Sequence, residues 1–367
     1  MTESILVLMH ADETGSLTSG SLEAVTAGME LSARIGAPLA VGVVAVNGSL
    51  AASLGFGNAR VFAVSGEAFA QSRYASDAAA CEALCRAAQP SIVLLPSSSR
   101  FTRVAAGVAH RLGGLIDTHI TSINVTDEDL VQANRSFYRQ RIEAVLSRDA
   151  RPWFLVMDAG THAAFAGDGV AVEVESVPLE LPELRTQVID LRAPQQNALT
   201  IRPEAKLLLV AGAGWTKKQA DGQTHAAEAG DLILGFLRNT SASLGSSKSL
   251  VDQGGDGQPV LPFLTHMNQI GQTGSTPRHA KGLSTCCHGE EPHGVGWRFI
   301  SDRRAISLDP NCGWARGKAD VVYVADAFKV MEKLNARLAA ANASNSAKSA
   351  PDADLTHSQD VDAAVVV

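Results

Sequence analysis

The segment "PSIVLLPSSSRFTRVAAGVAHRLGG" occupies residues 90–114 and decides the fold class that we expect for this chain. Its SIVLLP portion (91–96) is a short apolar run typical of a buried strand, and three serines follow it. After the serines, Val104, Val108 and Leu112 recur at helical spacing. A buried strand that leads straight into such a helix is the repeating unit of an α/β protein with parallel strands.

The same alternation runs through the first half of the chain. SILVLM (4–9) and PLAVGVVAV (38–46) read as buried strands, with a helix between them that Gly36 should end. Between about 120 and 185 the pattern changes to extended segments with short turns. We therefore expect the first domain to end in antiparallel strands.

A second α/β unit begins at KLLLVAGAGW (206–215), after a proline-punctuated stretch without periodicity. The expected fold is two doubly wound α/β domains. The expected boundaries are a first domain over 1–185, a linker over 186–205, a second domain over 206–338 and a disordered tail over 339–367.

Composition excludes several classes of protein. The net charge is −7, from 31 basic and 38 acidic residues, and no basic cluster suggests a nucleic-acid partner. No apolar run approaches the roughly 18 residues that a membrane-embedded helix needs. Five irregularly spaced cysteines argue against a secreted disulfide scaffold, and the first residues enter a strand at once. We expect a cytoplasmic protein.

Residues 266–297 hold the greatest density of polar, thiol and imidazole groups. In QIGQTG (269–274), two glycines let the backbone approach a ligand, although composition alone also allows an ordinary polar loop. The nearby cysteines and histidines leave open a metal site or a cysteine–histidine pair, but their spacing favours neither. These residues are Cys286, Cys287, His288, His293 and Cys312. Cys81 and Cys85 share an apolar helix face and read as core residues.

The second domain as a whole resembles the alpha subunit of electron transfer flavoproteins. Five stretches match that family's motifs in order and spacing: SSKSLVD (246–252), NQIGQTG (268–274), CCHGEEPH (286–293), AISLDP (305–310) and KAD (318–320). Residues 90–114 are also similar to a segment of the family's first domain. The resemblance covers about residues 1–335.

This resemblance implies an electron carrier rather than a stand-alone enzyme. It implies that the second domain is of an FAD-binding type and holds FAD. It also implies a heterodimer with a beta-type subunit, a flavin dehydrogenase as electron donor and a quinone reductase downstream. The implied cofactor-binding residues are Ser247, Lys248, Gln269, Gln272, Thr273, Gly274, His288, Gly289, His293, Ser307 and Asp320. The resemblance implies no metal-binding residue and no catalytic residue.

Individual roles follow from matching the motifs. Thr273 would donate to flavin N5, and His293 would lie near the pyrimidine carbonyl, where negative charge collects on reduction. Gln269 and Gln272 would hold the ring and the ribityl chain. Gly289 would let the backbone approach the pyrophosphate. Asp320 would accept from the adenosine ribose hydroxyls.

Three departures from the family pattern leave alternatives open. Lys248 replaces an arginine and loses its planar fork, Ser307 replaces an asparagine, and Cys286 places bulk where the family has glycine. The chain could therefore bind AMP or ADP, or no nucleotide. In that case it would be a structural subunit of a larger dehydrogenase complex.

Overall fold

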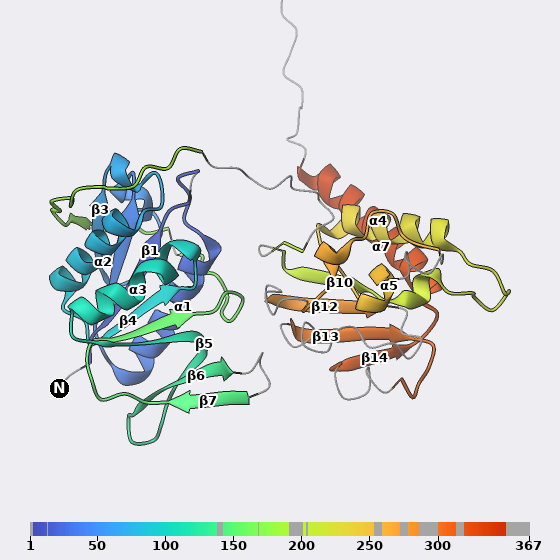
Figure 1. Ribbon diagram of the computed structural model, residues 1–367, viewed down its shortest axis with the longest axis horizontal. Coiled ribbons are helices and arrows are strands. Elements are labelled where there is room, and N and C mark those ends of the chain that lie inside the picture. Colours follow the sequence, from blue (N-terminus) through green and yellow to red (C-terminus); the bar gives the residue numbers. More distant parts are fainter. Residues whose placement is uncertain are drawn as a thin grey trace, which may run out of the picture.

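The computed structural model shows a mixed α/β chain with two sheets, one in each half (Figure 1). The fold class expected from the sequence is confirmed. The residues that the structure describes are 3–12, 14–137, 142–167, 169–190, 201–202, 205–252, 259–271, 278–285, 300–312 and 319–349.

The first sheet has nine strands in the order β7-β6-β5-β8-β4-β1-β2-β3-β9. Their bounds are β1 Ile5–His10, β2 Leu39–Ala45, β3 Arg60–Ser65, β4 Ile92–Pro96, β5 Leu115–Val125, β6 Val131–Phe137, β7 Ile142–Leu146, β8 Trp153–Met157 and β9 Val174–Ser176. Strand β1 pairs in parallel with both β2 and β4. The direction in which the sheet grows therefore reverses between β1 and β4, which defines a switch point.

Three helices cover the two faces of this sheet. They are α1 Ser19–Ile35, α2 Tyr74–Ala88 and α3 Ser99–Arg111. Helix α1 packs on the face that carries Val7 and Met9. Helices α2 and α3 pack on the opposite face, which carries Leu6 and Leu8 (Figure 1). Alternate residues of β1 thus enter two separate cores, as expected for a strand buried on both sides.

Helix α1 has the start and stop that its sequence predicts. The Thr18 hydroxyl accepts a hydrogen bond from the backbone of Ser21, and Gly36 ends the helix in the left-handed region at φ 63°. A cap of the first kind stabilises a helix by about 1 kcal/mol. Glycine takes the left-handed conformation at the end without the penalty of a Cβ.

The end of the first domain differs in part from expectation. Strands β5, β6 and β7 are antiparallel, but β8 lies in the parallel part of the sheet, between β4 and β5. Strand β9 also pairs in parallel, at the β3 edge. All five residues of β8 are buried. A strand that is apolar on both faces belongs in a sheet covered by helices on both sides.

The second sheet has five parallel strands in the order β11-β10-β12-β13-β14. Their bounds are β10 Leu207–Ala211, β11 Ser243–Ser246, β12 His279–Thr285, β13 Ile300–Ser307 and β14 Val321–Val324. Numbered within the domain, this order is 2-1-3-4-5, which is one of the two common doubly wound arrangements. Its switch point lies between β10 and β12.

The described residues of the second half form three α-helices: α4 Ala226–Thr240, α5 Lys248–Asp252 and α7 Ala327–Ser349. Helices α4 and α7 lie side by side (Figure 1), and the Asn335 amide donates to the carbonyl of Leu232 at 2.9 Å. Helix α7 continues past the expected end at residue 338, because the alanine-rich stretch that follows favours a helix. Residues 350–367 of the expected tail lie outside the described residues. Among the described helices, none combines the length and the apolar character that crossing a bilayer requires.

Candidate functional site

The carboxyl ends of the second sheet's strands are where an open α/β sheet binds its ligands. These ends are Ala211, Ser246, Thr285, Ser307 and Val324. They line one edge of the sheet, the edge toward which the arrows of β12, β13 and β14 point in Figure 1. Segments that follow β10 and β12 border the switch point, so residues next to them are the first candidates for a site.

Ser247 and Lys248 follow directly after β11. The backbone N–H of Ser247 donates to the Ala211 carbonyl at 2.9 Å and ties the ends of β10 and β11 together. The Ser247 side chain is fully buried, and its hydroxyl accepts from the backbone of Leu250 at 3.2 Å. Lys248 is exposed, and its Nζ lies 3.7 Å from a carboxylate oxygen of Asp252. Ser247 therefore shapes the edge, while Lys248 brings a cation to its surface.

Gln269 lies beside the end of β11, although it is 23 residues away from Ser246 in the sequence. The two residues form a parallel bridge, and the Ile270 N–H donates to the Ser246 carbonyl at 3.2 Å. This approach requires Gly245, because a Cβ there would lie 2.6 Å from a methyl carbon of Ile270. The fold thus brings two of the segments that resemble family motifs into contact.

Asn268 fixes the same segment through its side chain. Its amide donates to the Leu244 carbonyl at 3.1 Å, and its oxygen accepts from the Thr265 backbone at 3.0 Å. The next turn begins at Gly271, whose φ is 72°. Sequence reasoning missed Asn268 as a positioning residue, because its role depends on a strand far away in the chain.

Ser307 is the last residue of β13 and is buried. Its hydroxyl accepts from the Asp309 backbone N–H at 3.2 Å, so it shapes the turn that leaves the strand. Ser307 therefore lies at the same carboxyl edge as Ser247 and Gln269.

Asp320 lies at the opposite edge from these residues. It precedes β14, and its carboxylate binds the Arg303 guanidinium at 2.9 Å and the Arg303 backbone N–H at 2.7 Å. These hydrogen bonds hold the pKa of Asp320 below its ordinary value. The structure does not bring Asp320 together with the other candidates.

The acidic residue that follows β14 at the carboxyl edge is Asp326. Its side chain accepts from the Phe328 backbone at 2.9 Å and caps the start of α7. Sequence reasoning did not single it out.

The remaining candidates, Gln272, Thr273, Gly274, His288, Gly289 and His293, lie outside the described residues. Thr285, the described residue that precedes 286–293 in the sequence, is the last residue of β12 and lies at the carboxyl edge.

A test of whether this edge suits a nucleotide comes from Ser246. Its hydroxyl is fully buried at the end of β11 and has no hydrogen-bond partner among the described residues. A buried hydroxyl without a partner costs about 1–3 kcal/mol, so such groups commonly mark a missing partner. Together with the Lys248 cation and the Gln269 amide, this donor set fits a polar, negatively charged nucleotide.

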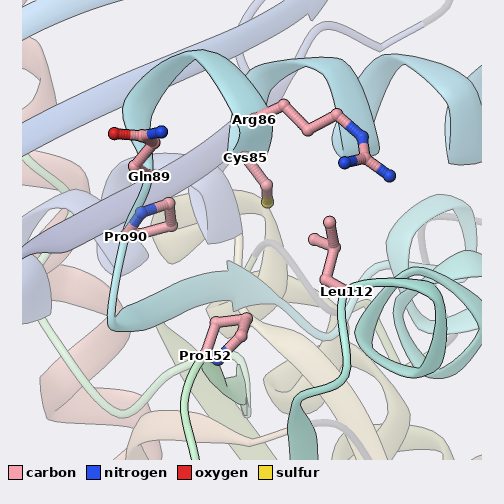
Figure 2. Close-up of a pocket in the computed structure, with 6 residues that line it drawn as sticks. All are labelled: Cys85, Arg86, Gln89, Pro90, Leu112 and Pro152. Carbon is pink, nitrogen blue, oxygen red and sulfur yellow. The ribbon is translucent and has the colours of Figure 1, made fainter.

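Three cavities lined by described residues lie in the first domain, away from the candidate residues. One of about 330 Å³ lies at the amino edge of the first sheet (Figure 2). Its lining residues are Cys85, Arg86, Gln89, Pro90, Leu112 and Pro152. Figure 2 shows the Cys85 thiol directed at the space between Leu112 and Pro152. Burial raises the pKa of this thiol to about 12, so it is a core thiol and not a nucleophile.

Another cavity, of about 250 Å³, lies at the carboxyl ends of β1 and β2 and is lined in part by Asp12, Thr14 and Asn47. Pockets that hold small molecules or cofactors usually measure roughly 300–1,000 Å³, so this one is small for a dinucleotide. No cluster of three or more metal-ligating side chains occurs among the described residues.

Comparisons with known proteins bear on the first half of the chain. Residues 5–182 match the sequence model of the electron transfer flavoprotein domain, a range that spans the whole first sheet. No match to a curated protein was found.

Among solved structures, an ADP-heptose lps heptosyltransferase II of E. coli aligns over 92% of this chain and 99% of that chain, at 13% identity. Its TM-score of 0.25 is too low to carry an argument. The domain match over residues 5–182 covers just under half of the chain, and it shows that the first half is similar to the electron transfer flavoprotein domain.

Proposed function

We propose that this chain is an alpha-type subunit of an electron transfer flavoprotein, that it forms a heterodimer with a beta-type subunit in the cytoplasm, and that it binds FAD in its second domain. It carries electrons from a flavin dehydrogenase to a quinone reductase downstream. The flavin supplies the electron-accepting chemistry, and the chain supplies binding and orientation.

One observation carries this proposal beyond the family match. Ser247, Lys248, Gln269 and Ser307 come from three separate segments, and all lie at the carboxyl edge of one parallel sheet. That edge is where a doubly wound sheet binds a dinucleotide. Lys248 would offset the negative charge of the cofactor, and Gln269 would offer an amide that both donates and accepts.

Roles for the other motif residues are part of the proposal. The Thr273 hydroxyl would donate to flavin N5, and His293 would place a donor near the pyrimidine carbonyl. Gln272 and Gly274 would shape the turn around the ring, while His288 and Gly289 would face the pyrophosphate. Each role rests on the family motif, and Thr285, which precedes 286–293 in the sequence, lies at the carboxyl edge.

Identifying the bound nucleotide tests the proposal. The full chain is co-expressed with a beta-type subunit, purified and denatured, and the released nucleotide is identified by chromatography. Stoichiometric FAD is the expected result. Release of AMP or ADP alone, or of no nucleotide, would overturn FAD binding by this chain.

A pair of variants adds a test of the site itself. Thr273→Ala should lower the FAD content or shift the flavin absorbance spectrum. Thr240→Ala is the matched control, because its hydroxyl bonds only at the C-terminal end of α4: it donates to the Phe236 carbonyl at 2.7 Å and accepts from the Ala242 backbone N–H at 3.3 Å. Equal FAD content and equal spectra in both variants would remove Thr273 from the site.

A second candidate function is that of a structural subunit in a larger dehydrogenase complex. The observation in its favour is that Asp252 already lies 3.7 Å from the Lys248 ammonium and so partly neutralises the cation that FAD would need. This candidate predicts a colourless chain that is present in stoichiometric amounts in the purified complex.

A further inference from the structure

The loop after β8 brings the first half of the chain into contact with the second. Asp158 follows β8 directly, and its Oδ2 lies 3.6 Å from Nε of Arg278. The two side chains are only 17% and 16% exposed, so solvent screens this ion pair less than a surface pair. Arg278 immediately precedes β12, the strand that leads to the proposed site.

A second observation independently places the two backbones in contact. Gly160 has φ 74°, and a Cβ at this position would lie 2.9 Å from the Cβ of Arg278 and 3.4 Å from its carbonyl oxygen. A Cβ essentially never approaches another atom closer than 3.0 Å, so the approach depends on glycine. The turn is therefore fitted to Arg278 in shape as well as in charge.

The turn over 158–161 is held firmly within the first domain. The Gly160 N–H donates to a carboxylate oxygen of Glu23 at 2.6 Å, and the Thr161 hydroxyl donates to the Asp158 carbonyl at 2.8 Å. The Asp158 N–H donates to the Ile120 carbonyl at 2.8 Å. Because β5, β8 and α1 all fix the turn, Arg278 contacts a rigid part of the first domain.

Asp158 also has a neighbour within its own domain. Nδ1 of His119 lies 3.3 Å from Asp158 Oδ1, and His119 is largely exposed. The carboxylate is thus shared between an exposed imidazole on one side and the Arg278 guanidinium on the other.

We propose that the turn Asp158–Thr161 is a docking seat that holds the second domain through Arg278, and that loss of the Asp158–Arg278 pair frees the second domain to reorient. Interfaces between domains of one chain are commonly small and polar, and relative motion is their default behaviour. A single partly buried ion pair is weak enough to break and re-form during such motion. This inference deepens the proposed function, since a carrier has to present its flavin to two partners; its test requires no cofactor.

Charge reversal tests the electrostatic part. Small-angle X-ray scattering of the full chain should give a larger radius of gyration and maximum dimension for Asp158→Arg and for Arg278→Asp. The double variant with both reversals should return to the wild-type values, since it restores an opposite-charge pair. The control is Glu175→Arg, which breaks the Arg60–Glu175 pair within the first domain and should leave the scattering unchanged.

A glycine pair tests the steric part. Gly160→Ala should also enlarge the particle. Gly169→Ala is the matched control, because its φ of 73° imposes the same backbone strain and its Cβ would meet nothing within 4 Å. Thermal unfolding of each variant verifies that it folds.

Two results would overturn the docking seat: single reversals that scatter like the wild type, or a double reversal that does not recover. If Gly160→Ala and Gly169→Ala gave the same scattering, the close approach of Arg278 would not require glycine at position 160. A chain that lacks FAD but shows the expected scattering would refute the proposed function alone. FAD binding with unchanged scattering would refute the docking seat alone.

Discussion

The indole N–H of Trp215 donates a hydrogen bond to the Thr285 hydroxyl at 2.8 Å. Both side chains are fully buried, and the Thr285 hydroxyl in turn donates to the Val210 carbonyl at 3.3 Å. This contact joins the segment after β10 to the last residue of β12. It fixes the two strand ends that border the switch point of the second sheet.

Replacing Trp215 with phenylalanine should therefore loosen this edge. Trp215→Phe removes the donor and some volume, and we expect a loss of about 1–2 kcal/mol in the free energy of unfolding. Urea unfolding measures this value. Trp153→Phe is the comparison in the first domain, because that indole donates to the Asp117 carboxylate at 2.9 Å. A hydrogen bond to a charged acceptor is stronger, so a smaller loss for Trp153→Phe than for Trp215→Phe would contradict this account.

Lys248 should matter for the cofactor and Lys281 should not. Both lysines are exposed, but Lys281 lies near the amino end of β12. We expect Lys248→Met to weaken FAD binding about tenfold, which corresponds to about 1.4 kcal/mol. Lys281→Met makes the same change in charge and should bind FAD as the wild type does. Titration with FAD, followed by flavin fluorescence, measures both, and equal affinities would remove Lys248 from the site.

Ser246 and Ser243 are two buried serines of β11, and we expect their replacement by alanine to affect stability differently. The Ser243 hydroxyl accepts from the Arg202 backbone at 2.8 Å and donates to the Arg202 carbonyl at 3.0 Å, whereas Ser246 has no partner among the described residues. Without cofactor, Ser243→Ala should cost about 1–3 kcal/mol of unfolding free energy, and Ser246→Ala should cost nothing or add stability. Urea unfolding of the two variants compares them directly. A matching loss in both would show that Ser246 has a partner in the protein.

Glu23 should make stability depend on pH. Burial raises its pKa above the ordinary value of 4.5, and the hydrogen bonds from Gly160 and Ser19 only partly oppose this. The folded state thus favours the protonated form. This contribution to stability is full below the unfolded pKa and is lost as pH rises through the folded pKa.

Glu23→Gln stays neutral and can still accept from Gly160. Its melting temperature should match the wild type near pH 4 and exceed it at pH 7.5. In Glu82→Gln the sign should reverse, because Arg111 and Arg86 lower the pKa of Glu82. A melting-temperature difference for Glu23→Gln that does not change with pH would show that Glu23 ionises normally.

Thiol reactivity should separate the cysteines. Cys81, Cys85 and Cys312 are buried and free, and burial raises the pKa of Cys81 and of Cys85. In the native chain at pH 8, at most two of the five thiols should react promptly with Ellman's reagent, and these should be Cys286 and Cys287. All five should react after denaturation. Prompt reaction of three or more native thiols would contradict the burial described here.

Periodicity predicted the elements better than their partners. The run at 91–96 is a strand at Ile92–Pro96, and the run at 38–46 is a strand at Leu39–Ala45. The sequence did not reveal that Trp153–Met157 enters the parallel core, because a buried apolar run has the same pattern in either orientation. Strand β3 was missed, although Gly57 and Asn58 before it and Gly66 after it are turn signals that bound an apolar run.

The order of the motifs predicts that Ser247, Lys248, Gln269 and Ser307 belong to one site, and this stays a prediction. The structure shows that they lie along one edge of the sheet, which depends on a strand register that motifs do not give. Asp320 and Asp326 each follow an alanine and lie six residues apart. Only the pairing of Arg304 with Val321 shows that Asp320 precedes β14 and that Asp326 follows it. A motif fixes chemistry and spacing, whereas pairing decides to which end of a strand a side chain belongs.

Strand β12 runs from the Arg278 contact to the carboxyl edge, and its pairing with β10 and β13 keeps it straight and rigid. Six residue steps from His279 to Thr285, at about 3.3 Å each, separate its two ends by about 20 Å. A pivot of about 20° at the Arg278 end would sweep the far end through roughly 7 Å. A small movement at the Arg278 end, which leaves both hydrophobic cores intact, therefore becomes a larger movement at the carboxyl edge, where electrons would enter and leave.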